Sequence, residues 1–302
     1  MLKDTSYALL RRLSFIETAI QEYVEKQKNP PIVIADIGCG TGELLTIPLS
    51  IKLGKTSTIY AYEPEILTFR NLEKRVKELG IQNIQPIQNK ESLQNQIYDV
   101  IIVSEVIEHV KKPIAFINNL KYKLKPFGIM IITTPNGFGI FEIETMLFNT
   151  LELVGIINML RKIKKGLFQT RNSNNTSLNA DTLAISPHIN FFTLRDLHQI
   201  LAEVGLSLKK IEGKHFAAGP FSDRILNKSK KLVELNAKLG KKFPLVLVAG
   251  WMLVAENKEN RSAQIEYSDL IKGANIFRRW YSKYKRLINV HAAHNLEHKK
   301  KN

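Results

Sequence analysis

The sequence predicts an α/β fold, a doubly wound, seven-stranded and mostly parallel sheet with a helical lid inserted into it. Two observations predict this fold. Short apolar runs of strand length alternate with longer segments whose apolar residues recur at helical spacing. A turn with glycine at every second position, in the segment IADIGCGTGELL at residues 34–45, follows the first of these apolar runs. The 302 residues are enough for one large domain with insertions.

The first elements are predicted from apolar spacing and from residues that break helices. Residues 5–28 have the spacing of a leading amphipathic helix, which the sequence NPP at residues 29–31 ends. The segment IVIAD at residues 32–36 is short and apolar, as expected for a strand that is covered on both faces. We expect the next helix to begin at Gly42.

Strands and helices then alternate as far as residue 135. We expect strands at residues 58–63, 84–88, 98–105 and 128–135, and helices at residues 66–80 and 113–124. The links between these segments are short, which is typical of a doubly wound parallel sheet.

The alternation breaks over about residues 138–187. An apolar, amphipathic stretch is followed there by the Asn- and Ser-rich segment RNSNNTSLNAD. This connection is too long to be ordinary, and lids and binding caps are often inserted after a central strand. The sequence therefore predicts a helical lid in this region.

The sheet pattern resumes after the lid, with a helix whose predicted cap is Thr193. We expect this helix at residues 193–206, a sixth strand at 206–213, a basic helical segment at about 222–240 and a long seventh strand at 244–257. The predicted domains are an N-terminal helix (residues 1–29), a core domain (30–257) and a basic tail (258–302).

The composition describes a globular protein with a large excess of positive charge. Hydrophobic residues make up 44% of the chain and charged residues 24%, and the net charge is +16. Cys39 is the only cysteine, which excludes an internal disulfide and a cysteine-rich metal site and fits a reducing, cytoplasmic location. We identify no secretory signal at the N-terminus and no apolar stretch of bilayer length.

The glycines of the turn, Gly38, Gly40 and Gly42, predict a ligand site. Glycine lacks a Cβ atom, so the main chain can turn sharply and approach a ligand closely. Glu63, at the end of the second predicted strand, would accept hydrogen bonds from ribose hydroxyls. The NAD fingerprint is G-x-G-x-x-G, whereas the spacing here is G-x-G-x-G after Asp36. A tight strand-to-helix turn without a ligand is the structural alternative.

This loop resembles motif I of the class I S-adenosylmethionine-dependent methyltransferases, and the resemblance extends over roughly residues 30–255. YDVIIVSEVIEHVKKP resembles the fourth-strand region of their small-molecule branch. LKPFGIMIITTPN resembles their fifth strand, with Phe127 in place of a glycine, and PHINFFTLRDLHQILAEVGL resembles the segment after their lid. Similar motifs occur in ubiquinone-biosynthesis O-methyltransferases and in enzymes that methylate glycans or lipids. The resemblance implies a Rossmann-like methyltransferase fold and the cofactor S-adenosyl-L-methionine.

The resemblance also implies which residues bind the cofactor. These are Asp36, Gly38, Cys39, Gly40, Gly42, Glu63, Pro64, Asn89, Ser104 and Glu105. Asn89 departs from the family pattern, in which a small residue and an aspartate often contact the adenine amine. Its amide oxygen can still accept a hydrogen bond from that amine.

Methyl transfer is an in-line displacement, so the protein mainly supplies alignment and excludes water. A hydroxyl acceptor must also lose a proton, and His109 and His188 are the candidate bases. For each, the alternative is a structural histidine bonded to a backbone carbonyl. Carbon-5 methylation of pyrimidines, methylation of base amino groups and radical methylation are set aside, because their cysteines or Asn/Asp-Pro-Pro-aromatic motif are missing. Mainly O-methylation, or N-methylation of a small amine, is left.

Glu105, Glu108 and His109 also suggest a metal site. In the resembling ubiquinone enzymes the E-x-x-E-H pattern is associated with a divalent cation, and on a helix the three side chains would share one face. The same pattern is widespread in methyltransferases that use no metal. We therefore expect Glu105 to lie beside the methionine end of the cofactor and assign no metal ligand.

Positive charge gathers in the insertion, at residues 228–242, and at residues 278–286 with the terminal lysines. Solvated helix faces are the simplest interpretation. The apolar insertion turns abruptly basic, which favours a lipid-linked or amphiphilic acceptor and peripheral contact with an anionic membrane at its inner face. We expect O-methylation of a small, glycan or lipid-linked acceptor near a membrane surface. Two alternatives are an RNA-directed methyltransferase, with tail aromatic residues stacked on bases, and a cofactor-binding protein without catalysis.

Overall fold

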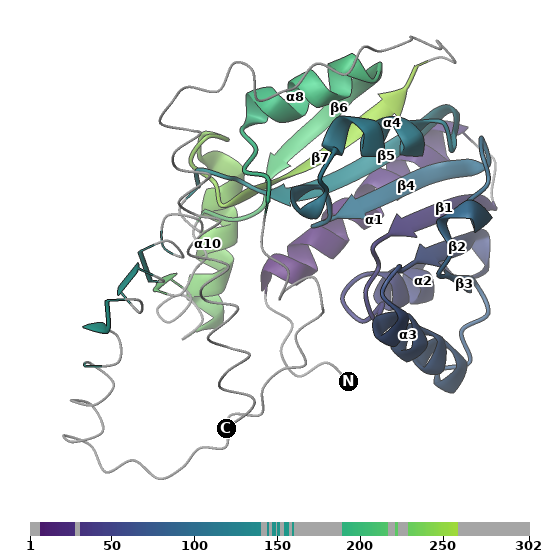
Figure 1. The fold of residues 1–302 in the computed structure, drawn as a ribbon, viewed down its shortest axis with the longest axis horizontal. Coiled ribbons are helices and arrows are strands. Elements are labelled where there is room, and N and C mark those ends of the chain that lie inside the picture. The colour runs from purple at the N-terminus through teal and green to yellow at the C-terminus, as the bar shows by residue number, and fades with distance from the viewer. Residues whose placement is uncertain are drawn as a thin grey trace.

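A computed structural model describes residues 7–27, 31–139, 189–216 and 229–258, together with residues 144, 147, 148, 150, 151, 154–156, 159, 221 and 222. Its centre is a seven-stranded sheet in the order β3-β2-β1-β4-β5-β7-β6, in which β7 alone runs antiparallel to its neighbours (Figure 1). The strands are β1 (Ile32–Ile37), β2 (Ser57–Tyr62), β3 (Ile84–Ile87), β4 (Tyr98–Ser104), β5 (Leu124–Pro135), β6 (Leu206–Gly213) and β7 (Gly250–Asn257). The predicted doubly wound sheet is confirmed.

Helices cover both faces of the sheet, because residues along each central strand alternate between two apolar cores. Ile34 and Val100 face the core formed with α1 (Tyr7–Gln27), α2 (Thr46–Leu53) and α3 (Ile66–Glu78). Ala35 and Ile101 face the core formed with α4 (Pro113–Lys121) and α8 (Leu194–Glu203). Figure 1 shows α4 and α8 in front of the sheet and α1 behind it. The strands are buried on both sides, which explains their nearly continuous apolar sequences.

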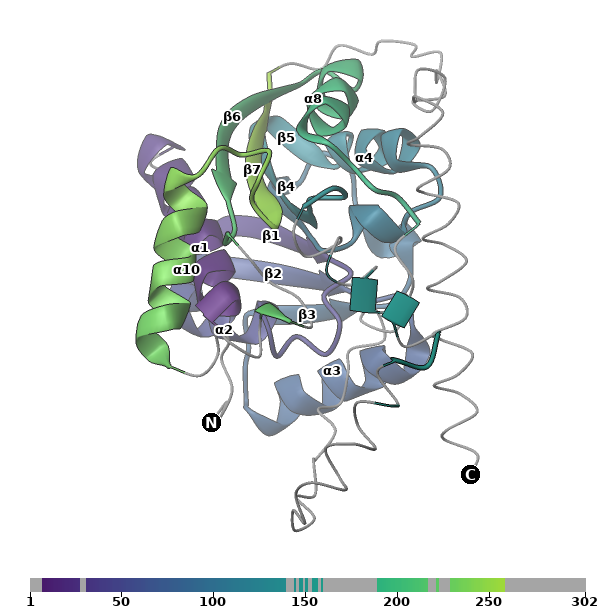
Figure 2. The ribbon, with the colours of Figure 1, turned by 90° about the vertical axis from the view of Figure 1, so that its left-hand side faces the viewer.

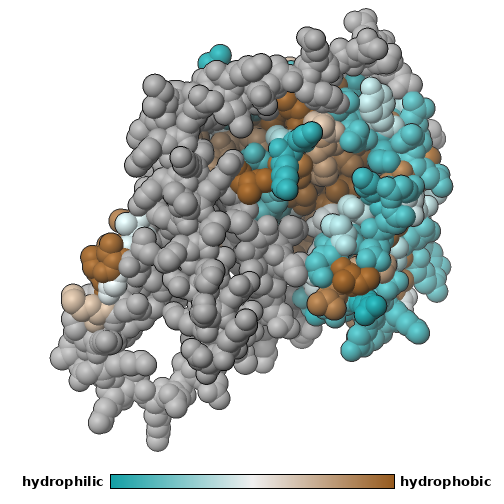
Figure 3. All heavy atoms as spheres, in the orientation of Figure 1, coloured by the Kyte–Doolittle hydropathy of each residue, from teal (hydrophilic) through white to brown (hydrophobic). Residues whose placement is uncertain are grey.

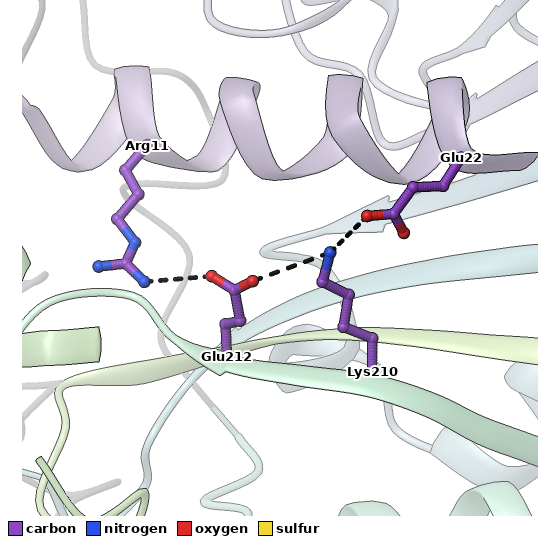
Figure 4. A network of polar contacts seen from close by, with 4 residues as sticks. All are labelled: Arg11, Glu22, Lys210 and Glu212. Carbon is purple, nitrogen blue, oxygen red and sulfur yellow. Dashed lines mark hydrogen bonds and ion pairs between the residues drawn. The ribbon is translucent and has the colours of Figure 1, made fainter. Parts of the chain in front are cut away.

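The leading helix α1 packs on the sheet and beside α10 (Lys230–Lys242), as Figure 2 shows. Charged side chains join α1 to β6 (Figure 4). Arg11 lies 3.4 Å from Glu212, and Lys210 lies 2.8 Å from Glu22 and 3.9 Å from Glu212. Partly exposed pairs of this kind contribute about 0–1 kcal/mol each, so apolar burial supplies most of the attachment of α1.

Three boundaries differ from the sequence prediction. The second helix begins at Thr46 rather than Gly42, because Gly42 has φ 75° and cannot continue a right-handed helix. β7 begins at Gly250 rather than at residue 244, because Leu247 N–H donates to Pro244 O (2.9 Å) in a turn. The described part of the basic helical segment begins at Lys230.

Other local predictions are confirmed. Thr193 caps α8 in a reciprocal box, in which Asp196 N–H donates to Thr193 Oγ1 (3.3 Å) and Thr193 N–H donates to Asp196 Oδ2 (2.7 Å). Most of the predicted lid at 138–187, and the tail from residue 259 onward, lie outside the described residues. Within the part of the chain that the structure describes, no helix has the length and apolar character needed to cross a bilayer.

Candidate active site at the carboxyl ends of β1, β2 and β4

The glycine turn after β1 is built from left-handed residues. Gly38, Gly40 and Gly42 have φ angles of 70°, 61° and 75°, a left-handed region that is sterically disfavoured for residues with a Cβ atom. Packing adds a second requirement at two of them. A Cβ atom at Gly38 would lie 2.7 Å from Val106 Cγ2, and one at Gly42 would lie 2.6 Å from Leu72 Cδ1. The glycines are therefore needed to form the loop itself, in addition to any approach of a ligand.

Glu63 joins this loop to the end of β2. Its carboxylate is 2% exposed and accepts hydrogen bonds from Gly40 N–H at Oε2 (3.0 Å) and from Glu65 N–H at Oε1 (2.9 Å). A carboxylate oxygen has two lone pairs, so each of these atoms can accept more than one hydrogen bond. Pro64 follows on the surface of the same turn.

Asp36 is buried beneath the loop, near the end of β1. Thr46 Oγ1, at the start of α2, donates to Asp36 Oδ2 (2.7 Å). Burial raises the pKa of Asp36 to about 6, although the Thr46 hydrogen bond and the Arg12 charge lower it. The fold thus holds the Asp36 carboxylate away from water, where its charged form is disfavoured.

Glu105 follows β4 with a left-handed backbone, φ 57°. Its N–H donates to Thr133 O (2.9 Å), and its Oε1 accepts from Thr133 Oγ1 (2.6 Å) and from Lys214 Nζ. Burial would raise the pKa of Glu105, but the charges of Lys214 and Arg12, with these hydrogen bonds, lower it to about 2. Ser104, the preceding residue, lies 3.0 Å from Thr133 Oγ1 through its hydroxyl.

Two basic residues at this site were missed by the sequence motifs. Arg12, on α1, is close enough to Asp36 and Glu105 to lower the pKa of both, and its Nε is buried without a hydrogen-bond partner among the described residues. Lys214 lies directly after β6. The available signals were an Arg-Arg pair within an apolar helix and a lysine at the carboxyl end of a strand.

The remaining predicted residues are spread around this edge of the sheet. Asn89 is exposed after β3 and accepts from Glu91 N–H (3.2 Å). Cys39 is half-buried within the loop, and its thiol contacts Gly40 O at 3.7 Å. His109 is half-buried after β4, whereas His188 lies outside the described residues. Of the two candidate bases, His109 is therefore the one whose place at this edge of the sheet is described.

The helical geometry assumed for a metal site is wrong. Glu105 has a left-handed backbone, and Ile107–His109 form a single 3₁₀ turn (η3), so the three side chains share no α-helical face. Glu108 instead accepts from Thr134 Oγ1 (3.3 Å). Over the described ranges, no group of three His, Cys, Asp or Glu side chains is placed to hold a metal ion.

The donor set fits a nucleoside joined to an amino acid. The Glu63 carboxylate is an acceptor of the kind that sugar hydroxyls require, and the left-handed turn at Gly40 leaves main chain without a side chain beside it. The buried Arg12 Nε offers a donor for a carboxylate. Three carboxylates, Glu63, Asp36 and Glu105, thus lie at the ends of neighbouring strands, at the edge where parallel sheets bind ligands.

Comparison with known proteins identifies this chain as similar to methyltransferases. A family model described as "Methyltransferase domain" matches residues 8–211. The ubiquinone biosynthesis O-methyltransferase of Rickettsia typhi is 35% identical over 157 residues, 48% of this chain and 61% of the relative. That of Parvibaculum lavamentivorans is 25% identical over 189 residues, 63% of each chain. The chain thus spans about three fifths of the length of these curated relatives.

Among solved structures, the magnesium protoporphyrin IX methyltransferase of Synechocystis PCC 6803, crystallised with bound S-adenosylhomocysteine, superposes with a TM-score of 0.45. It is 16% identical, and the superposition covers 82% of this chain and 83% of that one.

Proposed function

The chain belongs to the methyltransferase-domain family, whose members use S-adenosylmethionine, and we propose that it methylates a hydroxyl oxygen of a small or lipid-linked acceptor. The buried Glu63 carboxylate, bonded to the left-handed Gly40 and at the end of β2, is the observation that carries the cofactor part of this proposal. The relatives, which are ubiquinone biosynthesis O-methyltransferases, support oxygen as the acceptor atom.

The chain's own residues divide the work of binding. Glu63 would accept hydrogen bonds from the ribose hydroxyls, and Arg12 Nε would donate one to the carboxylate of the amino-acid part. Glu105 would lie beside that end of the cofactor. When bound, the cofactor supplies a methyl group that is already activated on a sulfonium. The protein then has to align the acceptor oxygen and exclude water.

The acceptor proton needs a base, and His109 and His188 are the candidates. His109 follows β4 at the ligand edge, and its Nδ1 atom is buried. A base in this position would take the hydroxyl proton as the oxygen attacks the methyl group.

A lipid-linked acceptor is supported by the exposed apolar side chains of the described part of the insertion. Leu147, Val154, Ile156 and Met159 are 49%, 60%, 41% and 57% exposed. Figure 3, in the orientation of Figure 1, shows apolar atoms on the left-hand side of the molecule, where this part of the chain lies. Apolar side chains next to a basic segment suit the surface of an anionic membrane.

The cofactor assignment is tested by calorimetric titration with S-adenosylhomocysteine. We expect Glu63→Ala to weaken binding by about 1–3 kcal/mol, because a charge-assisted pair of hydrogen bonds to the ribose is lost. Lys125→Met, which breaks an ion pair with Asp99 at the opposite edge of the sheet, is the matched control and should leave affinity unchanged. Equal affinities of wild type and Glu63→Ala would contradict the assignment.

The acceptor class is tested with radiolabelled S-adenosylmethionine and hydroxylated acceptors that are offered with and without a lipid tail. Transfer that is faster to the tailed compounds, with cosedimentation on vesicles containing phosphatidylserine but not on neutral vesicles, would support the proposal. Label found on RNA, with salt-sensitive RNA retention, would contradict it.

A further inference from the structure

Lys214 is a buried lysine that belongs to none of the motifs carrying the family resemblance. Its backbone N–H donates to Gly250 O (2.8 Å), which ties it to the start of β7. Its side chain is 9% exposed, and Nζ bonds Glu105 Oε1 after β4. β7 and β5 lie between β6 and β4 in the sheet. The Lys214 side chain therefore links the end of β6 to the end of β4 across two intervening strands.

The path of Lys214 depends on the glycine at position 250. A Cβ atom at Gly250 would lie 3.0 Å from Lys214 Cδ and 2.8 Å from Thr134 O. The absence of a side chain at Gly250 therefore leaves room for the aliphatic part of Lys214 to pass. The contact between Lys214 and Glu105 therefore depends on Gly250 of β7 as well as on the lysine itself.

Glu105, at the end of this route, has a conformation that needs support. Its left-handed φ of 57° is disfavoured for any residue with a Cβ atom and persists only where neighbouring groups hold it. The holding groups are Thr133, through backbone and hydroxyl, and Lys214. Strain of this kind tends to occur at functional sites.

The charged and titratable groups around the pair come from α1, η3 and β1, and from His215, which faces both Lys214 and Glu105 and whose pKa burial lowers to about 4. Glu105 faces Lys214 and Arg12 of α1, while Lys214 faces Glu105, Arg12 and Glu108 of η3. Asp36 of β1 faces Arg12 in turn. Burial lowers the pKa of Lys214, whereas Glu105 and Glu108 raise it. Removal of the lysine would leave Glu105 with Arg12 as its cationic neighbour.

We propose that Lys214 is a positioning residue: it reaches over Gly250 and holds the Glu105 carboxylate in place at the edge where the cofactor binds, and so sets the affinity for the amino-acid end of the cofactor. This inference rests on the proposed function, because it takes that edge to be the cofactor site. Lys214 acts through Glu105 and need not touch the ligand.

A double-mutant cycle tests the proposal, with S-adenosylhomocysteine as the titrant and calorimetry as the measurement. We expect Lys214→Met to weaken binding about tenfold in the wild-type background and less than about threefold in the Glu105→Gln background, where no charged carboxylate needs to be held. Thermal unfolding of each variant is recorded in parallel. Lys125→Met should lower the unfolding temperature and leave affinity unchanged.

Equal losses of affinity in the two backgrounds would contradict the proposal, because Lys214 would then act independently of Glu105. Unchanged affinity of Lys214→Met would contradict it as well. A pH profile adds a signature that simple destabilisation would not produce. Without Lys214, burial should raise the pKa of Glu105, so binding should acquire a pH dependence that Glu105→Gln removes.

If Lys214→Met does not fold, Lys214→Arg decides the question, because it retains the cation. Affinity within about threefold of wild type supports the proposal, and a tenfold loss at an unchanged unfolding temperature contradicts it. Wild type that fails to bind S-adenosylhomocysteine would refute the proposed function. In that case the same cycle, measured on unfolding free energies, still tests whether Lys214 holds Glu105, and zero coupling would refute it.

Discussion

The two edges of the sheet use carboxylates in different ways. At the amino edge, Asp99 of β4 accepts from Val33 N–H (2.8 Å), Lys125 Nζ (2.8 Å) and Tyr23 OH (3.2 Å). At the carboxyl edge, Asp36 accepts from Thr46 and has a raised pKa, and Glu105 is held in a left-handed conformation. Asp99 at the amino edge connects elements of the fold, whereas at the carboxyl edge burial disfavours the charge of Asp36 and the backbone of Glu105 is strained.

Positive φ angles follow the same division. Phe127, near the start of β5, has φ 61° and is 53% exposed, so its strain supports no buried contact. Glu105, with φ 57°, is bonded by Thr133 and Lys214. Of these two residues, Glu105 is the one whose carboxylate is hydrogen-bonded by neighbouring side chains, as a role of its conformation at the candidate site requires.

The largest expected effect comes from the amino edge. Asp99→Ala removes the partner of Lys125, Tyr23 and Val33, and we expect it to lower the free energy of unfolding by about 3 kcal/mol. Urea unfolding measures this loss. Calorimetry on the folded fraction should give an unchanged affinity for S-adenosylhomocysteine. An affinity that falls with stability would show that the two edges do not have separate roles.

A smaller and opposite effect is expected at the carboxyl edge. The pKa of Asp36 is about 6 in the folded chain and 3.8 in the unfolded chain, so the folded state binds more protons between these values. Stability from this group is therefore present below pH 3.8 and is lost as the pH rises through about 6.

Asp36→Asn should remove this loss and raise the free energy of unfolding at pH 7 by about 1–3 kcal/mol. The same change should weaken cofactor binding, because the buried charge is gone. Urea unfolding at pH 4, 5, 6 and 7, with calorimetry at pH 7, measures both. A less stable variant at pH 7 would show that Asp36 acts structurally, as Asp99 does.

The smallest expected effect is at Phe127. Phe127→Gly relieves the left-handed strain of about 1–2 kcal/mol and loses part of that gain to the entropy of glycine, so we expect a net gain near 0.5 kcal/mol. Cofactor affinity should not change. Thermal unfolding and calorimetry check the two values, and a change in affinity would show that strain at the amino edge is also linked to the site.

Much of the fold, and the glycine loop after β1, followed from short stretches of sequence. The apolar runs predicted the sheet because parallel strands are buried on both faces. Gly38, Gly40 and Glu63 were identified because each lies where a strand ends, and the carboxyl ends of parallel strands meet at one edge. These features depend on neighbours in the chain, so local patterns are enough to reveal them.

The tertiary structure alone decided which charges share the site. Lys214 and Glu105 are 109 positions apart, and Arg12 comes from a helix that precedes the sheet. No periodic pattern records such a pairing, because it exists only once α1 and β6 have packed. The left-handed turn at Glu105 is also set by its contacts with Thr133 and Lys214, which overrule the helical geometry that its sequence motif suggested.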